Sequence, residues 1–459
     1  MKKIIAFLVL VVIVIALLPI VGNKLVEGEL SNRVEVLVSY GVEVSQSSTE
    51  SSYLNTKKHY EFVVEDTEKF MQYLSQFADA QLPPYIDAMV DGIRIGVDVE
   101  YSNFPISDGI FLDIYPLTLS KNMMQNLKKE DINFYTYIEN LLQNRGVLYH
   151  LNYNVVNSGF KGYIKDIKEE YVLKEKTKIT LELLDASFEG NGVLVAPDRL
   201  SSRVGTIKFT VTNENEKFNV ELKEFTSSST FESQSTYASG AKLQSMEFVI
   251  TGTGTKDAKL KLDELHVNAS ANTQGETAEY NLKTSFKALD IVAKTSTFQA
   301  ADFNYDISLS GVDKKSVEEL RVLFSQAKVS LSPDLEEKIQ KSVVNIISKG
   351  LTFFIADFSL AQVGLDNVPM VKGFNLKSKL DIKADADLAQ KLQNAPLLLV
   401  QNIDLDATFK FSKALFALLN KKAPLSSIAN NYAKEEGEDF VFDIKFVQGE
   451  LTVNDKVLQ

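Results

Sequence analysis

The sequence predicts an α+β, β-rich protein whose main feature is a long curved antiparallel sheet, built from meander hairpins with bulges and packed by several amphipathic helices. One N-terminal transmembrane helix precedes this sheet. Three observations predict this fold class. They are an uncharged apolar run at the N-terminus, a long central region that alternates with period two between polar turns, and apolar stripes with helical spacing on both sides of that region.

The N-terminal run extends from Ile4 to Val21 without a charge, after Lys2 and Lys3. A helix of this length spans roughly 27 Å, which is enough for the core of a bilayer. A cleaved signal peptide would have a shorter apolar region and a small-x-small cleavage site, so the run favours an uncleaved signal anchor at residues 4–22. The positive-inside rule then places residues 1–3 in the cytoplasm and exports the chain after about residue 23.

Residues 24–146 are predicted to mix strands and helices. The stretch 24–64 alternates in polarity and predicts short strands. Phe70, Tyr73, Leu74 and Phe77 have the spacing of an amphipathic helix, and a second helix is expected to begin near Asp131.

Residues 147–312 are predicted to form an antiparallel β meander. Four strand patterns contain an odd apolar spacing, at Leu222/Phe225, Leu243/Met246, Leu262/Leu265 and Phe286/Leu289. Because strand side chains alternate between faces, an odd spacing moves the apolar residues to the other face unless a bulge restores it. Aligned bulges would bend the sheet into a trough or half-barrel. The alternative interpretation is an ordinary sandwich whose strands cross from one buried face to another.

Residues 313–459 are predicted to form helices and C-terminal strands that continue the same sheet. Ser332, Pro333 and Asp334 have the character of a helix start, and Gly350 that of a helix stop. Two short helices are expected around 413–420 and 425–434, before a C-terminal hairpin.

Composition excludes several classes of function. The net charge of -12 argues against a nucleic-acid partner, because phosphate neutralisation needs a concentrated basic face. The 459 residues contain no cysteine, which excludes disulfides, thiolate metal sites and cysteine nucleophiles.

No catalytic constellation stands out, so we predict no enzyme activity, no metal site and no cofactor. His266 is expected on the polar face of its strand, and His59 and His150 have no carboxylate at ligand spacing in the sequence. Asp381, Asp385 and Asp387 lie close together, but the glycine and glutamate of a calcium loop are missing; polar residues at a strand-to-helix junction are the alternative explanation.

The apolar strand faces are the remaining candidate for function. An ordinary core accounts for most such residues. A curved, apolar-lined sheet would also be able to hold an acyl chain, because ligand sites are concave and mostly apolar. The predicted lining residues are Leu260, Leu262, Leu265, Val267, Tyr280, Leu282, Phe286, Leu289 and Ile291.

The sequence resembles the YdgA family of bacterial proteins of unknown function. The resemblance is carried by the N-terminal anchor and by five segments: YSNFPIS (101–107), FNVELKEFTSSSTF, KLQSMEFVI, ISKGLTFFIADFSL and FDIKFVQGELTVN. In the first segment, Tyr101, Ser102 and Asn103 stand where the family usually has His-Gly-Pro. The resemblance implies a single-pass protein of the bacterial inner membrane with a cytoplasmic N-terminus and a large periplasmic domain. The strand pattern is also similar, more loosely, to AsmA-like envelope proteins.

Together these observations predict a non-enzymatic cell-envelope protein. Its partners would be the inner membrane, through residues 4–22, and a lipid or other hydrophobic ligand on the curved sheet. The alternative is a periplasmic scaffold that recruits an envelope protein by strand addition. A hydrolase acting on envelope material is the least favoured function, because no nucleophile–base pair is present in the sequence pattern.

Overall fold

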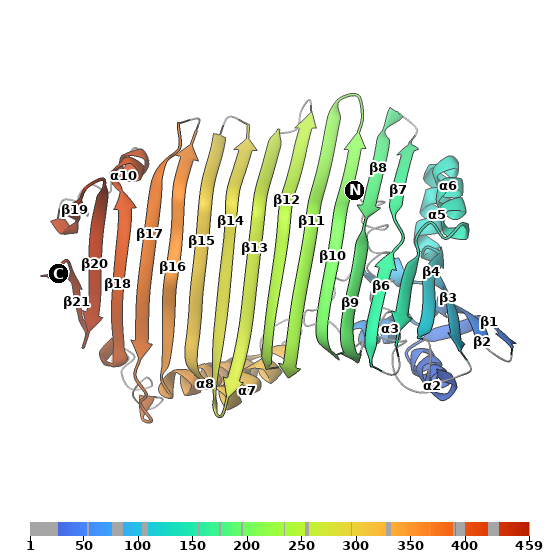
Figure 1. Ribbon diagram of the computed structural model, residues 1–459, viewed down its shortest axis with the longest axis horizontal. Helices are drawn as coiled ribbons and strands as arrows, with labels where there is room; N and C mark the ends of the chain where they lie inside the picture. Colours follow the sequence, from blue (N-terminus) through green and yellow to red (C-terminus); the bar gives the residue numbers. More distant parts are fainter. Residues whose placement is uncertain are drawn as a thin grey trace. The chain divides into compact units, whose positions relative to one another are not determined.

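The computed structural model describes residues 26–458, with gaps at 53–54, 76–85, 103–108, 155–156, 174–175, 194–195, 234, 253–256, 295, 327–331, 367, 389–390, 392–399 and 421–430. The chain divides into two compact units, Met1–Thr230 and Phe231–Gln459, which we call the N-terminal and the C-terminal unit. Both are built on open antiparallel sheet, and the described residues contain eight helices (Figure 1). The β-rich antiparallel fold is therefore confirmed.

The N-terminal unit combines five described helices with strands β1 to β10 and most of β11, whose last three residues belong to the C-terminal unit. The helices are α2 (Val26–Ser39), α3 (Thr67–Ser75), α4 (Ile86–Val90), α5 (Lys121–Glu130) and α6 (Ile132–Gln143). The strands are β1 (Val42–Ser51), β2 (Asn55–Val64), β3 (Arg94–Ser102), β4 (Ile110–Thr118), β5 (Tyr149–Tyr153), β6 (Gly159–Ile164), β7 (Ile167–Val172), β8 (Lys178–Leu184), β9 (Ala186–Val193), β10 (Ala196–Thr212) and β11 (Glu216–Ser233). Strands β1 to β6 pair in chain order, and β6 continues to β9 and β10.

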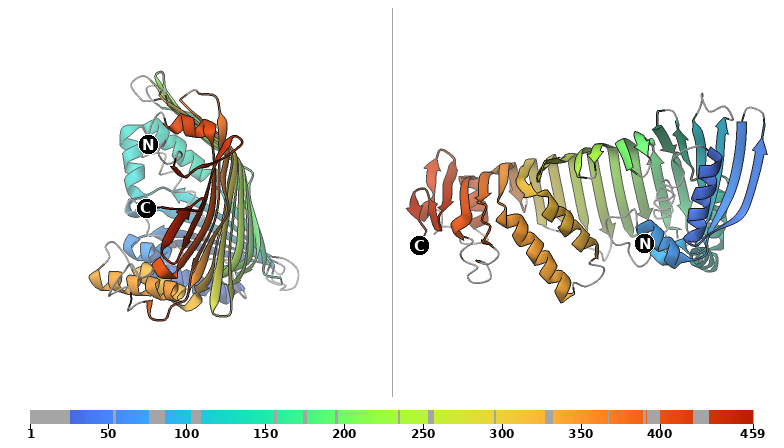
Figure 2. Two further views of the ribbon diagram at one scale, coloured as in Figure 1. Left: turned by 90° about the vertical axis from the view of Figure 1, so that its left-hand side faces the viewer. Right: turned by 90° about the horizontal axis from the view of Figure 1, so that it is seen from below.

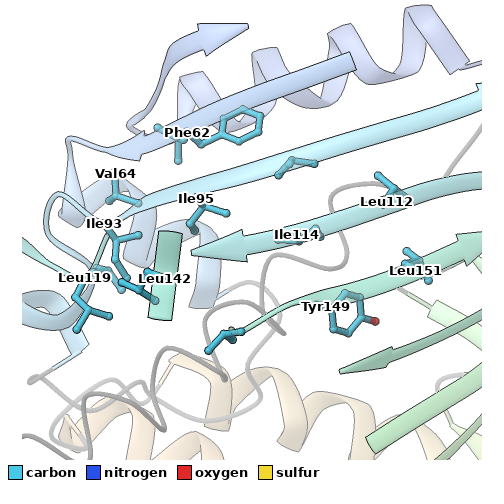
Figure 3. Close-up of a cluster of buried hydrophobic side chains, with 14 of the residues drawn as sticks. Phe62, Val64, Ile93, Ile95, Leu112, Ile114, Leu119, Leu142, Tyr149 and Leu151 are labelled. Carbon is cyan, nitrogen blue, oxygen red and sulfur yellow. The ribbon is translucent and has the colours of Figure 1, made fainter. Parts of the chain in front are cut away.

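One face of this N-terminal sheet forms a conventional core. Leu112, Ile114 and Leu151 are at most 1% exposed and pack with residues of α3 to α6 (Figure 3). The predicted helix at 70–77 is present as α3, where Phe70 is fully buried. The predicted helix near Asp131 is present as α6, because the Asp131 side chain caps it by accepting hydrogen bonds from the backbone N–H groups of residues 133 and 134.

The C-terminal unit is a meander in which β12 to β18, and then β20 to β22, pair with their neighbours in chain order. The strands are β12 (Thr236–Gly252), β13 (Ala258–Gln274), β14 (Thr277–Ala293), β15 (Ser296–Asp313), β16 (Leu351–Leu365), β17 (Val371–Ile382), β18 (Ile403–Ser412), β19 (Lys434–Glu436), β20 (Asp439–Val447), β21 (Glu450–Val453) and β22 (Lys456–Val457). Helices α7 (Lys314–Gln326) and α8 (Pro333–Ser348) connect β15 to β16, and α10 (Lys413–Asn420) follows β18.

Two of these helices confirm their sequence signals closely. Helix α8 begins as predicted, with the Ser332 Oγ accepting a hydrogen bond from Leu335 N at 3.3 Å, and Gly350 follows it with a φ of +81°. Helix α10 occupies the predicted range 413–420. Most of the second short helix, predicted at 425–434, lies outside the described residues.

The recorded strand pairings show no register shift at the four odd apolar spacings, and at two of them, Leu222/Phe225 and Leu262/Leu265, a residue with positive φ stands between the apolar pair. At Leu262/Leu265 the strand register is the same on both sides: Leu243 faces Leu265, and Met246 faces Leu262. No register shift occurs there, so the prediction of a bulge at this position is wrong. Instead Glu264 adopts a φ of +53°. This left-handed conformation reverses the alternation of side chains at Glu264, so that Leu262 and Leu265 lie on the same face of the sheet.

The same device recurs at other strand centres. Glu224 in the N-terminal unit and Asp302 in the C-terminal unit also have a positive φ, of +49° and +52°, and Asp185 has one of +53° between β8 and β9. Register shifts occur at other positions, between Ala278 and Tyr280 and, in the middle of β16, between Ile355 and Phe358. The sheet therefore keeps one apolar face without inserting a residue at Glu224, Glu264 and Asp302, but with a register shift in β16.

Two further predictions concern the N-terminal segment. Part of the stretch 24–64 is helical, because Val26–Ser39 forms α2 in place of the short strands expected there. The predicted anchor, residues 4–22, lies outside the described residues. Within the residues that are described, no helix is both long and apolar enough to cross a membrane.

Candidate functional site

The nine predicted lining residues lie together on one face of strands β13 and β14. Leu260 faces Ile291 across the strand pair, and Leu262 faces Leu289. On the other side of Glu264, the alternation resumes with Leu265 and Val267 on β13 and with the remaining predicted residues on β14. Phe286 and Leu289 pack against the same buried cluster, so both sides of the rotation share one face.

This face extends well beyond the two strands that the sequence singled out. We define the apolar face as the side of β13 to β18 and β20 that carries these nine side chains and their in-register partners. Three successive rows of partners cross strands β16, β17, β18 and β20. They are Phe358–Leu376–Phe409–Phe442, Ile355–Ser378–Ala407–Ile444 and Phe353–Leu380–Leu405–Phe446.

Aromatic rings form a continuous series on the apolar face. Phe286 stacks on Phe303 with ring centroids 4.8 Å apart, and Phe303 meets Phe358 edge-on at 6.0 Å. The series continues through Phe374 to Phe409 on β18. Such aromatic pairs stabilise a sheet and hold its side chains in fixed positions, so the surface they form is preorganised.

The apolar face is less covered than the core of the N-terminal unit. Leu112 and Leu151 in that core are completely buried. In contrast, Phe353, Ile355 and Leu376 on the apolar face are half-buried, and so are all nine predicted residues. A contiguous, partly exposed apolar surface of this kind marks an interaction or ligand site more often than a structural core.

Helices border the apolar face at its two ends. Leu415 and Leu418 of α10 pack against Ala300, Leu360 and Val363 of the sheet. At the other end, burial together with Tyr237 and Glu318 of α7 raises the pKa of Tyr280. Figure 2 shows α7, α8 and α10 on one side of the C-terminal sheet. The middle of the apolar face lies between these helices.

Asp313 fixes the start and the end of the α7–α8 connection. Its Oδ2 accepts hydrogen bonds from Ser316 N at 2.8 Å and Ser316 Oγ at 2.7 Å, and its Oδ1 pairs with Lys349 Nζ at 2.5 Å. Burial opposes ionisation of the Asp313 carboxyl, but the contacts with Lys349 and Ser316 outweigh burial and lower its pKa. The helix pair is thus held at the edge of the apolar face.

The opposite face of the same strands is polar. Lys283 Nζ lies 3.1 Å from Asp306 Oδ2, and Asn375 Nδ2 donates a hydrogen bond to Asp357 Oδ1. His266 is exposed on this side. The C-terminal sheet therefore has two different faces. Polar side chains lie on one face, and partly exposed apolar side chains lie on the other.

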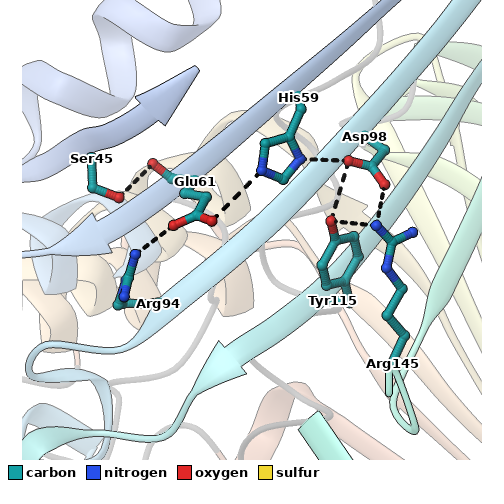
Figure 4. A network of polar contacts seen from close by, with 7 residues as sticks. All are labelled: Ser45, His59, Glu61, Arg94, Asp98, Tyr115 and Arg145. Carbon is teal, nitrogen blue, oxygen red and sulfur yellow. Dashed lines mark hydrogen bonds and ion pairs between the residues drawn. The ribbon is translucent and has the colours of Figure 1, made fainter. Parts of the chain in front are cut away.

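The structure also reveals a polar network that sequence reasoning missed. His59 on β2 pairs through Nδ1 with Asp98 Oδ1 at 2.6 Å, and Arg145 Nη2 lies 2.7 Å from Asp98 Oδ2 (Figure 4). The Arg145 guanidinium stacks 3.9 Å from the centroid of the Tyr115 ring and donates a hydrogen bond to its hydroxyl. Next to it, Glu61 pairs with Arg94.

A second histidine–aspartate pair lies beside the first. His150 Nδ1 is 2.6 Å from Asp113 Oδ1, and Asp113 faces Asp98 across β3 and β4. These partners are far apart in sequence and meet only through the strand register, so no local motif announces them. The sequence spacing of His59, Asp98, Asp113 and His150 does not correspond to a recognisable catalytic or metal-binding motif.

In the described contacts His59 does not have the arrangement of a serine-type triad. In a serine-type triad, the histidine nitrogen that is not held by the aspartate faces a hydroxyl. Here His59 Nε2 faces the Glu61 carboxylate, with Oε1 3.7 Å away. No group of three or more His, Asp or Glu residues in the described ranges is arranged to hold a metal ion.

The aspartates considered for calcium are engaged by other groups. Thr352 Oγ1 donates a hydrogen bond to Asp381, and Lys379 pairs with it. Asp385 accepts hydrogen bonds from Lys391 Nζ at 2.6 Å and Asn402 Nδ2 at 2.8 Å. These carboxylates serve local structure at the end of β17.

The fold and the site define an open antiparallel β-sheet protein with a half-exposed apolar face. Residues 170–459 match the model of the family DUF945, which is described as a bacterial protein of unknown function. The match covers more than half of the chain, so the chain belongs to this family. No curated protein and no solved structure matches it.

Proposed function

We propose that the protein is a non-enzymatic cell-envelope protein that binds lipid acyl chains on the apolar face of its C-terminal unit. The observation that carries this proposal is the half-buried state of the apolar side chains from β13 to β20. Burying apolar surface stabilises a complex by about 25 cal/mol per Å². A ligand that covers this face gains that energy without desolvating charged groups.

An acyl chain fits the face better than a protein partner does. Protein interfaces have a polar rim and about one hydrogen bond per 100–200 Å². The three rows across β16 to β20 contain a single hydroxyl, that of Ser378, among twelve side chains. A hydrocarbon chain has no hydrogen-bonding groups to satisfy, and such a surface suits it.

The location of the protein forms part of the same proposal. The apolar run at 4–22 supports a single-pass anchor in the bacterial inner membrane, with residues 1–3 cytoplasmic and the sheet units periplasmic. The resemblance to the YdgA family supports the same placement. In this arrangement the apolar face lies on the same side of the membrane as a source of lipid.

The proposal of a role without catalysis extends to the polar network of the N-terminal unit. His59 and His150 are oriented by aspartates, but neither pair is joined to a serine or threonine hydroxyl in the described contacts. Replacing both histidines by alanine is therefore expected to preserve the function of the protein in the cell envelope, so that cells with the variant have the same envelope phenotype as cells with the parent protein. Loss of the phenotype with retained folding would favour the hydrolase instead.

A scaffold function is the second candidate, and one observation favours it. Within the described residues β1 pairs with β2 alone, and almost all of its side chains are exposed. An exposed strand edge accepts an additional strand from a partner. In-cell crosslinking from β1 would return one reproducible envelope protein if this function is the right one.

The acyl-chain proposal is tested by photocrosslinking in bacterial cells that express the full chain. A photoreactive phenylalanine analogue replaces Leu282 on the apolar face, and the matched control carries it at the adjacent Lys283 on the polar face. Mass spectrometry of the purified adducts should show phospholipid attached at position 282 and none at 283. Equal labelling of both positions, or no lipid at either, would refute the proposal.

A further inference from the structure

The helix pair α7–α8 leaves the C-terminal sheet and returns to it at two neighbouring points. It connects β15 to β16, and these strands pair directly with each other, for example at Ser310 and Thr352. Figure 2 shows the pair projecting from the strand ends on the same side of the sheet as α10. Because α10 packs on the apolar face through Leu415 and Leu418, the helix pair also stands on the side of that face.

Described contacts fix the helix pair to the sheet at its two ends. The backbone N–H of Lys314 donates a hydrogen bond to the carbonyl oxygen of Glu276 at 3.0 Å. The backbone N–H of Asp385 donates one to the carbonyl oxygen of Ser348 at 2.7 Å. The ion pair between Asp313 and the lysine that follows α8 joins the two ends to each other. Both ends of the connection are therefore firmly attached.

The body of α8 is attached differently from its end. It contacts α7, and Leu335 and Ser342 are its buried residues. Within the described contacts, no side-chain hydrogen bond or ion pair joins residues 334–347 to a strand. Val343 is 38% exposed, and Ile347, one turn further along, is half-buried. Apolar side chains of α8 are thus still partly in contact with water after the two helices have packed together.

A glycine with positive φ stands at each end of the helix pair. Gly311 lies before α7 with a φ of +77°, and Gly350 follows α8 with a φ of +81°. A Cβ atom at Gly311 would have no neighbour closer than 3.6 Å, so the backbone conformation and not the available space favours glycine there. Hinges of moving segments are a few residues at element ends that absorb changes in φ and ψ. Both glycines have the position and the conformational freedom of such a hinge.

We propose that the helix pair α7–α8 is a hinged cover of the apolar face, which turns about Gly311 and Gly350 and is displaced when an acyl chain binds. This inference rests on the proposed function and adds its regulation. Closure removes apolar side chains of α8 and of the sheet from water together, and this burial favours the closed state when no ligand is present. The sheet side chains cannot contact α8 and an acyl chain at the same time. Cover and ligand therefore exclude each other.

The lengths of the two elements define a contact of the closed state. Val343 lies roughly 10 Å from Gly350 along α8, at ~1.5 Å per residue. Phe353 lies roughly 10 Å from Gly350 along β16, at ~3.3 Å per residue. When α8 folds onto β16 about Gly350, Val343 is therefore expected to meet Phe353. The next residue, Phe354, points to the opposite face of the sheet and is 42% exposed.

Engineered disulfides test the cover in the full chain, which contains no cysteine of its own. Val343→Cys is combined with Phe353→Cys on the apolar face, and in the matched control with Phe354→Cys on the polar face. Both variants are oxidised in bacterial cells, and mass spectrometry of the digested protein quantifies each disulfide. The yield should be about tenfold higher for the pair 343/353, a ratio that the burial of one apolar side chain provides. Equal yields in the two variants would overturn the cover.

The same variants test whether the cover and lipid exclude each other. The photoreactive phenylalanine analogue is placed at Leu282, which lies in one in-register row with Ile307 and Ile355. Phospholipid adducts at Leu282 should be lost when the pair 343/353 is oxidised and should return on reduction, which shows that the variant is folded. The control pair should leave the adducts unchanged.

Two outcomes separate this inference from the proposed function. Unchanged adducts at Leu282 in the oxidised 343/353 variant would overturn the exclusion of lipid by the cover, while the adducts themselves would support the proposed function. Absence of phospholipid adducts before oxidation would refute the proposed function and the displacement by lipid. A high yield of the 343/353 disulfide would in that case still support a cover that closes on the apolar face.

Discussion

Tyr115 illustrates how single residues hold the N-terminal unit together. Its ring lies against Gly96, where an added Cβ would be 2.4 Å from the Tyr115 Cε2 atom, so no larger residue fits at position 96 without displacing the ring. Its hydroxyl donates a hydrogen bond to Asp98 and accepts one from Arg145. One side chain thus connects β3, β4 and the end of α6.

The environment of Tyr115 predicts a specific pH dependence. Burial and the neighbouring Asp98 carboxylate raise its pKa to about 12, although Arg145 acts in the opposite direction. In the unfolded chain a tyrosine titrates near pH ~10, so above that pH the unfolded state loses the proton first. The stabilising contribution is complete below about pH 10 and is lost as the pH rises toward 12.

Tyr115→Phe removes this proton and should therefore reduce the alkaline loss of stability. Urea unfolding at pH 9 and pH 11 would measure it: the midpoint should fall less between these values in Tyr115→Phe than in the parent chain. The exposed Tyr163, replaced by phenylalanine, serves as control and should retain the parent behaviour. Equal losses in all three proteins would contradict this account of Tyr115.

Residue identities alone predicted the nine apolar positions but not the histidine–aspartate pairs. Alternation within one strand shows which residues share a face, and this is why Leu282 and Phe286 could be placed together. His59 and Asp98 are 39 positions apart in the sequence, and their contact depends on the register between β2 and β3. Register is decided by the packing of the whole sheet and has no local signature.

At the scale of elements, a left-handed residue in mid-strand replaces the expected bulge. Glu264 has a φ of +53°, a conformation that costs a residue with a Cβ about 1–2 kcal/mol. Its side chain pairs with Lys287 at 2.9 Å, an exposed contact that contributes little. This cost is offset because the left-handed conformation of Glu264 keeps Leu262 and Leu265 on the same face of the sheet.

This conformation predicts that glycine and alanine reverse their usual order at position 264. Glu264→Gly should be more stable than Glu264→Ala by about 1 kcal/mol, since glycine has no Cβ penalty at positive φ. At the adjacent Asp263, whose φ is not positive, alanine should be the more stable by about 0.5–1 kcal/mol. Chemical denaturation of the four variants measures both differences. The same order at both positions would show that Glu264 is not held in this conformation in solution.

The elements that the sequence predicted well are those with local end signals. Helix α8 has a serine cap, a first-turn proline and a terminal glycine, and all three act as expected. Helix α2 lacks such signals, and its VEVLVS pattern alternates like a strand, so the packing of Leu37 into the core decides its conformation. Positive φ at Glu224 and Glu264 was not predictable, because glutamate carries no preference for it.

At the scale of the whole molecule, the two units use their sheets differently. The N-terminal unit covers one sheet face with helices and buries residues such as Leu112 and Leu142 completely. In the C-terminal unit the described side chains in the middle of the apolar face are half-buried, and Leu415 and Leu418 of α10 pack against one end of the face. Burying this face further would add to the stability of the folded chain. The half-buried face is the basis for our proposal of a lipid ligand.

The most direct test of that claim is native mass spectrometry combined with lipid extraction. Residues 24–459 are exported to the periplasm of a bacterial host and purified without detergent. The account predicts a protein mass raised by a stoichiometric lipid, which extraction then releases and identifies as phospholipid. A folded protein of uniformly ligand-free mass, with no lipid in the extract, would contradict the claim that the apolar face is a lipid-binding site.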